Sequence, residues 1–264
     1  MKSRWKRLNN SEWVMTLLSF GVMLILWEAL VRFLEMPQWL LPAPSAIFAE
    51  MTQSSGYLYL HTLVTLREVL IGFILSVGIG IFLGVIIAYS PLLEKTLYKL
   101  LVATLSIPKV AIAPLLVLWL GLGEVSKVTM VFLMCFFPIM VGMVSGLQST
   151  SRELLELSDV LGANWLQSFL KIRFPASLPF LFNGLRVASS MAVVGAVISE
   201  FINADKGLGY SLLITTSKMN GPLAFSAVTI LALMGIGLFS VIAWLEKLIC
   251  PWAKTSQSRG RARS

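Results

Sequence analysis

Several apolar runs in this chain are longer than the ~20 residues that an α-helix needs to cross the hydrocarbon core of a membrane. Hydrophobic residues make up 57% of the 264 positions and charged residues only 13%, so the runs are rarely interrupted. Because the apolar residues are continuous within each run, the pattern is typical of membrane helices and not of a β-barrel. The sequence predicts an all-α integral membrane protein with about six transmembrane helices, at residues 13–34, 61–89, 97–120, 126–147, 182–203 and 223–249.

Basic residues are concentrated on one side of these predicted spans. They occur before the first span, between the second and third, in the long connection between the fourth and fifth, and after the sixth. The opposite side holds only Lys127, Lys206 and Lys218 in the sequence. This bias follows the positive-inside rule and places both termini and the long connection in the cytoplasm. We therefore assign the net charge of +8 to membrane orientation and exclude nucleic-acid binding.

The predicted organisation has three parts: a cytoplasmic N-terminal segment (1–12), a transmembrane domain (13–250) and a basic cytoplasmic tail (251–264). No small-residue cleavage site follows the first span, so we expect a retained anchor rather than a cleaved signal. Glu28 and Arg32 near its end have the spacing of a helical ion pair. Ser45 is predicted to cap a short helix along the membrane face. Cys135 and Cys250 lie in apolar segments and are expected to be buried thiols, not a disulfide.

The connection at residues 150–180 is longer than a simple loop needs to be, and long connections are usually functional. Two pairs of residues have the spacing of a helix capping box: Thr150 with Glu153, and Asn164 with Gln167. Gly162 is predicted to end the first helix because glycine accepts a left-handed backbone, and Pro175 to end the second. The sequence thus predicts a cytoplasmic helical hairpin, which is either an ordinary surface feature or a contact for a partner.

The third predicted span contains Pro108 and Pro114, each of which removes a helical hydrogen bond. Broken backbone survives at membrane depth only where it faces protein or a wet cavity. Lys109 adds a cation there, which is costly unless it is paired or hydrated. Lys109 therefore either lines a solute pathway and attracts an anion, or pairs with a helix C-terminus or a carboxylate. The pattern supports the two interpretations equally.

The fifth predicted span is rich in small residues, among them Ser189 and Ser190, so we expect it to pack closely at the centre of the bundle. Glu200 near its end precedes a turn at residues 207–210, and the sequence favours a solvated carboxylate beside a capped loop over a ligand site. In the second span, close helix contacts are predicted at Gly72, Gly78, Gly80 and Gly84.

The motifs of common catalytic sites are missing from the sequence. It has no G-x-x-x-x-G-K-[ST] phosphate-binding loop, so an ATP-driven transporter would need its ATPase on another chain. His61 is the one histidine, so an H-E-x-x-H zinc site is impossible. We therefore expect no enzymatic activity, no metal and no cofactor in this chain. An ion-coupled secondary transporter and a membrane enzyme or scaffold remain as alternatives.

Motifs spread over about residues 40–210 resemble the permease subunits of binding-protein-dependent ABC importers, specifically their nitrate, sulfonate and taurine branch. The first motif resembles the cytoplasmic EAA loop and consists of Glu156, of Gly162 six residues later, and of Pro175 and Pro179. The family carries two alanines after the glutamate, where this chain has Leu157-Ser158. The other motifs lie at residues 41–45, 61–73, 107–124 and 200–210.

The resemblance implies the type I ABC importer permease fold and a subunit that moves a small solute inward by alternating access. The solutes of this branch are often anionic, such as nitrate, sulfonates or taurine, although some relatives carry uncharged vitamin precursors. The implied location is the bacterial plasma membrane. The implied partners are a second permease copy, most simply an identical one, two cytoplasmic ATPase subunits that bind the ATP, and an extracytoplasmic substrate-binding protein.

The resemblance also implies roles for particular residues. ATP-driven movement would reach the spans through the hairpin, and the solute would pass between spans 3, 4 and 5 of two facing copies. The candidate ATPase-coupling residues are Glu156, Leu157, Asp159, Gly162 and Ala163. The candidate pathway and gate residues are Pro108, Lys109, Pro114, Ser189 and Ser190.

Overall fold

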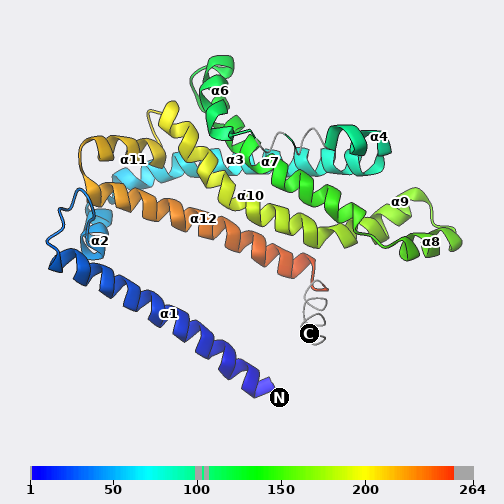
Figure 1. Cartoon of the computed structure of the whole chain (residues 1–264), viewed down its shortest axis with the longest axis horizontal. Coiled ribbons are helices and arrows are strands. Elements are labelled where there is room, and N and C mark those ends of the chain that lie inside the picture. The colour runs from blue at the N-terminus through cyan, green and yellow to red at the C-terminus, as the bar shows by residue number, and fades with distance from the viewer. Residues whose placement is uncertain (1, 99–102, 104–106, 253–264) are drawn as a thin grey trace. The chain divides into compact units, whose positions relative to one another are not determined.

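The computed structural model describes residues 2–98, 103 and 107–252, and these residues form helices and short connections without a strand (Figure 1). Three short elements depart from α-helical geometry, since η1 and η4 are π-helical and η3 is a 3-10 helix. The elements are α1 (Lys2–Phe33), α2 (Pro44–Gln53), α3 (Ser55–Tyr89), α4 (Pro91–Leu93), η1 (Glu94–Tyr98), η3 (Lys109–Ile112), α6 (Ala113–Leu120), α7 (Glu124–Gln148), α8 (Arg152–Val160), α9 (Trp165–Ser168), η4 (Phe169–Arg173), α10 (Phe174–Ile202), α11 (Leu208–Ser217) and α12 (Gly221–Ile249).

Five helical stretches among the described residues are long and apolar enough to cross a membrane, which confirms the predicted all-α, multi-pass architecture. They are Val14–Phe33, Ser55–Tyr89, Glu124–Gln148, Trp165–Ile202 and Gly221–Ile249. The predicted third span at 97–120 falls partly outside the described residues, at 99–102 and 104–106. Its described part is η3 followed by α6, which at eight residues is only about 12 Å long.

The prediction that Pro175 ends the second hairpin helix is wrong. The helical path runs from Trp165 to Ile202 through α9, η4 and α10. The π turn η4 shifts the hydrogen-bonding register just before the proline. Pro175 then lies in the first positions of α10, where its missing N–H is not needed. The membrane helix and the second arm of the hairpin are therefore one rod.

The chain divides into two compact units, residues 1–61 with 211–230 and residues 62–210 with 231–264. In the first unit, Arg32 pairs with Glu28 at 2.6 Å, which confirms the predicted ion pair. Ser45 does not cap α2, because Ala43 occupies that position. Instead the Ser45 backbone N–H and hydroxyl donate to the Glu28 carboxylate at 3.0 and 2.7 Å. Ser45 thus joins α2 to α1.

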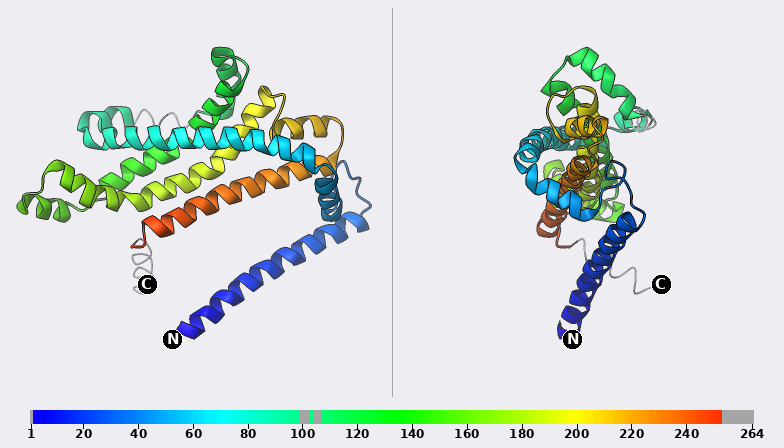
Figure 2. Two further views of the ribbon diagram at one scale, coloured as in Figure 1. Left: turned by 180° about the vertical axis from the view of Figure 1, so that it is seen from behind. Right: turned by 90° about the vertical axis from the view of Figure 1, so that its left-hand side faces the viewer.

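In the second unit, α3 and α10 both pack against α7, whose apolar side chains include the fully buried Met130, Val131, Ile139, Met140, Met143 and Val144 (Figures 1 and 2). The predicted close contacts of the second span hold for three glycines, because a Cβ at Gly72, Gly80 or Gly84 would meet Val131, Ile139 or Met143 of α7. A Cβ at Gly78 would meet nothing within 4 Å, so that glycine is not a contact.

The crossing of α7 and α10 is closer still. A Cβ built on Gly142 would lie 2.8 Å from the Phe180 carbonyl oxygen, and one on Gly184 would collide with the Pro138 carbonyl. Gly195 of α10 also lies against Val131 and Met134 of α7, and the Cys135 thiol donates to the Ala188 carbonyl. The predicted tight packing of the small residues of α10 is thus confirmed, and Ser189 is buried. Cys135 and Cys250 are both buried free thiols, as expected.

Candidate functional site

The hairpin (residues 151–168) begins with α8, whose N-terminal cap is Ser151. Its side-chain oxygen accepts the Leu154 N–H at 3.4 Å. The prediction of a cap at Thr150 is wrong by one residue, because the Thr150 hydroxyl donates to the Leu147 carbonyl at the end of α7. Gly162 ends the helical turn with φ +71°, a left-handed value that favours glycine, as predicted.

The second arm of the hairpin begins with the predicted capping box, which the structure confirms. The Gln167 N–H donates to Asn164 Oδ1 at 2.9 Å, and the Asn164 N–H donates to Gln167 Oε1 at 3.0 Å. This reciprocal pair fixes the start of α9, which continues without a break into η4 and α10. The hairpin is therefore attached stiffly to a membrane helix.

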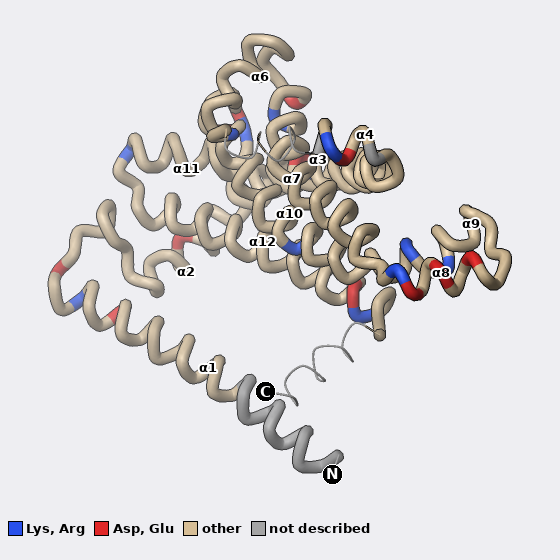
Figure 3. Tube along the Cα trace, turned by 45° about the vertical axis from the view of Figure 1, so that its right-hand side comes forward, with Lys and Arg blue, Asp and Glu red and all other residues tan. Residues whose placement is uncertain are grey.

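The five candidate coupling residues lie together on this hairpin. Glu156, Leu157, Asp159 and Gly162 are exposed, and Ala163 is half-buried. Charged side chains gather along α8 (Figure 3), namely Arg152, Glu153, Glu156 and Asp159. The hairpin also exposes the apolar side chains of Leu154, Leu157, Val160, Leu161, Trp165 and Leu166. Large apolar side chains exposed on a charged helix are typical of a protein contact.

The candidate pathway residues lie on three different elements, η3, α6 and α10. Pro108 and Pro114 are exposed at the starts of η3 and α6, and Lys109 is the half-buried first residue of η3. The Lys109 ammonium lies 4.7 Å from the centroid of the Phe137 ring, a partner that the sequence did not indicate. On α10, Ser190 is exposed, whereas Ser189 is buried and its hydroxyl donates to the Arg186 carbonyl at 2.7 Å. A shared role of these five residues in a solute pathway stays a prediction.

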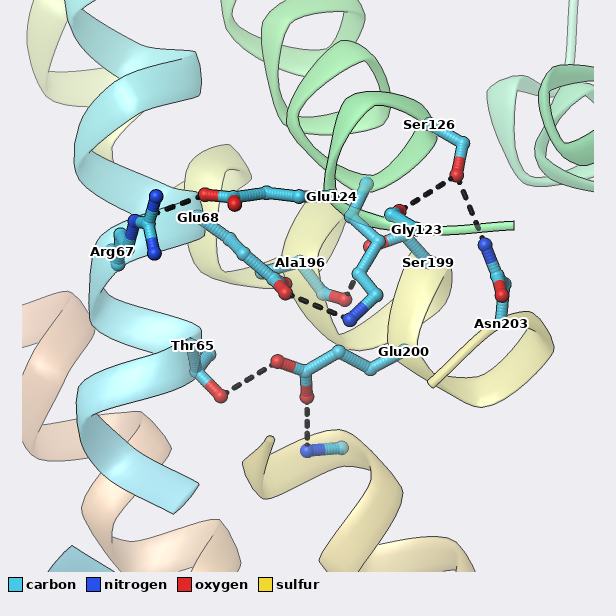
Figure 4. Close-up of polar contacts among 12 residues, drawn as sticks. Thr65, Arg67, Glu68, Gly123, Glu124, Ser126, Ala196, Ser199, Glu200 and Asn203 are labelled. Atoms are coloured by element: carbon cyan, nitrogen blue, oxygen red, sulfur yellow. Dashed lines mark hydrogen bonds and ion pairs between the residues drawn. The ribbon is translucent and has the colours of Figure 1, made fainter. Parts of the chain in front are cut away.

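A buried polar cluster joins α3, α7, α10 and the first two residues of α11 (Figure 4). We define it as Thr65, Glu68, Lys127 and Glu200 with the backbone N–H groups of 208 and 209. The Lys127 ammonium lies 3.0 Å from Glu68 Oε1, and the two side chains are only 8% and 3% exposed. Removing one partner of a buried ion pair leaves the other charge buried without compensation, which strongly destabilises the fold. Lys127 and Glu68 therefore depend on one another.

Glu200 is the centre of the second half of the cluster. The Thr65 hydroxyl donates to its Oε1 at 2.7 Å, and the Gly209 N–H donates to its Oε2 at 2.5 Å. The Leu208 N–H donates to the Thr65 hydroxyl oxygen at 2.8 Å. Glu200 is 1% exposed, so the expectation of a solvated carboxylate is wrong: the turn folds over it.

The Gly-Leu-Gly sequence of this turn follows from the contact with Glu200. A Cβ on Gly207 would collide with the carboxylate, and Gly207 also has φ +118°. A Cβ on Gly209 would lie 2.7 Å from Glu200 Oε2. Both glycines are therefore needed for the backbone to approach the carboxylate.

Two further contacts, one exposed and one partly buried, lie beside the cluster at the start of α7. Arg67 pairs with Glu124 at 3.0 Å, and the Asn203 side-chain amide donates to Ser126 Oγ at 3.0 Å (Figure 4). They bind the same three helices as the cluster does. Within the part of the chain that the structure describes, no group of three His, Cys, Asp or Glu side chains could hold a metal ion. The cluster and these two contacts hold α3, α7 and α10 together.

The sequence pattern did not assign Thr65, Glu68 and Lys127 to a shared site. The positive-inside pattern treats Lys127 as a charge flanking the membrane, and the motif at 61–73 that contains Glu68 implies no role for it. The available signal was the depth of both residues in apolar helices, since a charge at such a position is costly unless it is paired. The identity of the partner could not be read, because Glu68 and Lys127 lie 59 positions apart.

Comparison with known proteins identifies a family and several relatives that this chain resembles. Residues 77–254 match the family described as "Binding-protein-dependent transport system inner membrane component". The chain is 37% identical over 238 residues to the formylaminopyrimidine transport permease protein ThiX of Halalkalibacterium halodurans, covering 90% of this chain and 95% of the relative. It is 38% identical over 253 residues to the riboflavin transport system permease protein RibX of Chloroflexus aurantiacus, covering 94% of each.

A more distant relative belongs to the sulfonate branch. The putative aliphatic sulfonates transport permease protein SsuC of Bacillus subtilis is 28% identical over 243 residues, covering 91% of this chain and 88% of that protein. The resemblance inferred from the separate motifs is thus confirmed over most of the chain. Together with the several membrane-spanning helices, these matches show that the chain belongs to the binding-protein-dependent inner-membrane transport family, as an ABC transporter permease for small solutes.

Proposed function

We propose that this permease imports its solute by alternating access, driven by ATP hydrolysis on separate cytoplasmic subunits that bind the hairpin. The observation that carries the proposal is the hairpin's position at the end of an overlong helix. The stretch Trp165–Ile202 has 38 residues and is about 57 Å long, whereas a hydrocarbon core is ~30 Å thick. A large part of this rod, with the hairpin, therefore extends beyond the membrane.

The packing of the rod supports movement as one body. Its first residues are fixed by the capping box at Asn164 and Gln167, and its middle is packed against α7 through Gly142 and Gly184. Tightly packed helices shift between discrete arrangements rather than deform gradually. Displacement of the hairpin by an ATPase would therefore shift α10 and α7 together and change access to the solute pathway.

The proposed assembly contains two copies of this permease, two ATPase subunits and an extracytoplasmic binding protein. The family description names the dependence on a binding protein. The excess of basic residues on one side favours cytoplasmic termini and a cytoplasmic hairpin. The ATPase subunits would then reach the hairpin from the cytoplasm, and the binding protein would reach the permease from the opposite side of the membrane.

For the solute, we favour an uncharged nitrogen heterocycle over an anion. The relatives named for formylaminopyrimidine and riboflavin are 37% and 38% identical to this chain, against 28% for the relative named for aliphatic sulfonates. The one charge expected to attract an anion, Lys109, lies over the Phe137 ring. We expect Lys109→Met to leave uptake of the solute largely intact. If the wild type imports a sulfonate and Lys109→Met does not, the anionic alternative is supported.

The coupling role can be tested in proteoliposomes that contain the permease with its ATPase, with the binding protein added. Gly162→Pro and Glu156→Arg should each abolish solute-stimulated ATP hydrolysis and uptake while the permease still inserts. Asp205→Arg makes the same charge change in the exposed turn after α10 and is the control, which should transport normally.

Normal uptake by both hairpin variants would remove the coupling role. Uptake that needs no ATPase and collapses with an ionophore would instead support an ion-coupled secondary transporter. Co-purification of a phosphate-loop ATPase with the wild-type chain, and its loss from the Glu156→Arg variant, gives an independent measurement of the contact.

A further inference from the structure

The last residue of α3, Tyr89, contacts the hairpin arm through an aromatic cluster, which we call the aromatic joint (Tyr89, Trp165, Phe169 and Arg173). The Tyr89 ring lies 5.2 Å from the Trp165 ring and 5.7 Å from the Phe169 ring, both edge-on. Trp165 and Phe169 stack on one another at 5.9 Å. Edge-to-face and stacked rings at these separations attract one another.

A cation completes the joint. The Arg173 guanidinium lies 5.1 Å from the Tyr89 ring centroid, within the range of a cation–π contact. Trp165, Phe169 and Arg173 all belong to α9 and η4, so one continuous stretch of the rod surrounds the Tyr89 ring. The Tyr89 hydroxyl oxygen is buried and has no hydrogen-bond partner among the described residues, so the ring itself makes the contact.

The joint connects elements that the backbone does not connect. The rod carries motion from the hairpin to α10 through its own helix. Between α3 and the hairpin, by contrast, the chain passes through α6 and α7. At this end of α3, motion of the hairpin can therefore reach α3 directly only through side chains, and the joint supplies them.

The other end of the same helical segment carries Thr65 and Glu68 of the buried polar cluster. Thr65 and Tyr89 lie about 36 Å apart along α3, at 1.5 Å per residue. A displacement of Tyr89 along the helix axis would therefore also move Thr65 and Glu68, where α3 contacts Glu200 and Lys127. The helix links the hairpin end of the bundle to the cluster end.

We propose that Tyr89 is a positioning residue of the transport cycle, through which the hairpin moves α3 at the same time as it moves α10. This inference rests on the proposed coupling role of the hairpin. Through the joint, α3 moves when the rod moves. The end of the bundle that holds the hairpin and the end that holds the polar cluster then shift at the same time. Without it, the ATPase would still displace the rod, and α3 would follow only through its packing on α7.

The test compares Tyr89→Phe, Tyr89→Leu and Tyr89→Ala in the same proteoliposomes. Tyr89→Phe keeps the ring and should transport as the wild type does. Tyr89→Leu keeps apolar volume without the ring, and it should lower the number of solute molecules imported per ATP by about tenfold, because both ring pairs and the cation contact are lost. Phe169→Leu, which removes a ring of the joint outside the exposed apolar surface of the hairpin, should give the same loss.

Two further measurements separate this role from a merely structural one. Insertion and ATPase co-purification should be unchanged in Tyr89→Leu, and ATP hydrolysis should continue. A variant that uncouples hydrolysis from uptake in this way supports the proposal. A wild-type ratio of uptake to hydrolysis in Tyr89→Leu overturns it, as does a parallel loss of ATPase binding, which would make the joint part of the docking surface.

The outcome is distinguishable from failure of the proposed function itself. If Glu156→Arg abolishes uptake but Tyr89→Leu and Tyr89→Ala transport normally, the coupling hairpin stands and the joint does not. If wild-type uptake is independent of ATP, the proposed function fails, whatever the Tyr89 variants do.

Discussion

Thr65 donates a hydrogen bond of 2.7 Å to the carboxylate of Glu200, a residue 135 positions later in the chain. The same Thr65 oxygen accepts the Leu208 N–H, so a single hydroxyl group connects α3, the end of α10 and the turn that follows. The hydroxyl thus acts as both donor and acceptor. Substitutions in this cluster should therefore lower stability through lost hydrogen bonds as well as alter transport.

Glu200→Ala removes the acceptor of the Thr65 hydroxyl and of the Gly209 N–H. Hydrogen bonds to charged groups contribute about 1.5–3 kcal/mol each, so the free energy of unfolding should fall by about 3 kcal/mol or more. Glu200→Gln keeps one acceptor oxygen and the side-chain volume, and it should lose less. Denaturant unfolding of the purified protein in detergent measures both. Equal losses in the two variants would contradict the assigned hydrogen bonds.

Gly207→Ala introduces a methyl group that collides with the Glu200 carboxylate, at a backbone angle that alanine adopts only with strain. We expect a loss of about 2–4 kcal/mol in the free energy of unfolding. Gly237→Ala in α12 is the matched control, because its Cβ would meet nothing within 4 Å and alanine favours the helix. The thermal midpoints of the two variants should differ clearly, and a Gly207→Ala protein as stable as the control would show that the turn has another conformation.

Lys127→Met leaves the Glu68 carboxylate buried without its ion partner, which should cost about 3–5 kcal/mol. The double variant Lys127→Met with Glu68→Gln removes both charges, so it should recover most of the lost stability. Unfolding measurements on the wild type, Lys127→Met, Glu68→Gln and the double variant together form a complete double-mutant cycle. Additive losses would be evidence that the two side chains do not interact.

The side of the membrane on which the hairpin lies can be tested with membrane-impermeant maleimide. Leu161 is 76% exposed at the hairpin tip, and the natural cysteines are buried, so Leu161→Cys provides a single reactive thiol. We expect labelling only in inside-out vesicles. Lys206→Cys, in the exposed turn after α10, should be labelled only in right-side-out spheroplasts. The reverse pattern would place the hairpin outside and remove the proposed ATPase contact.

The sequence predicts the membrane helices well because their signal is local. Continuous apolar runs identify the helices that end at Tyr89, Gln148 and Ile249, and the capping box at Asn164 and Gln167 is correct to the atom pairs involved. The hairpin, with Gly162 at its turn, follows from the same short-range rules.

The errors occur where tertiary contacts or unusual helix geometry determine the outcome. Glu200 looks like a loop carboxylate because the sequence does not show that the turn at 207–209 folds back over it. Ser45 is not a cap because Glu28 takes its hydroxyl. Pro175 does not end a helix because a π turn precedes it, and propensity rules carry no signal for such a turn.

The uninterrupted rod from Trp165 to Ile202 constrains the length of the chain between hairpin and membrane. Surface connections usually tolerate inserted or deleted residues, but each residue added to or removed from a helix rotates everything beyond it by about 100°. A one-residue change within 169–173 would turn Glu156 and the exposed leucines away from their partner even though every side chain of the hairpin remained present. If the hairpin binds an ATPase as proposed, the spacing between these two parts would determine that pairing as much as the identity of any residue at the contact.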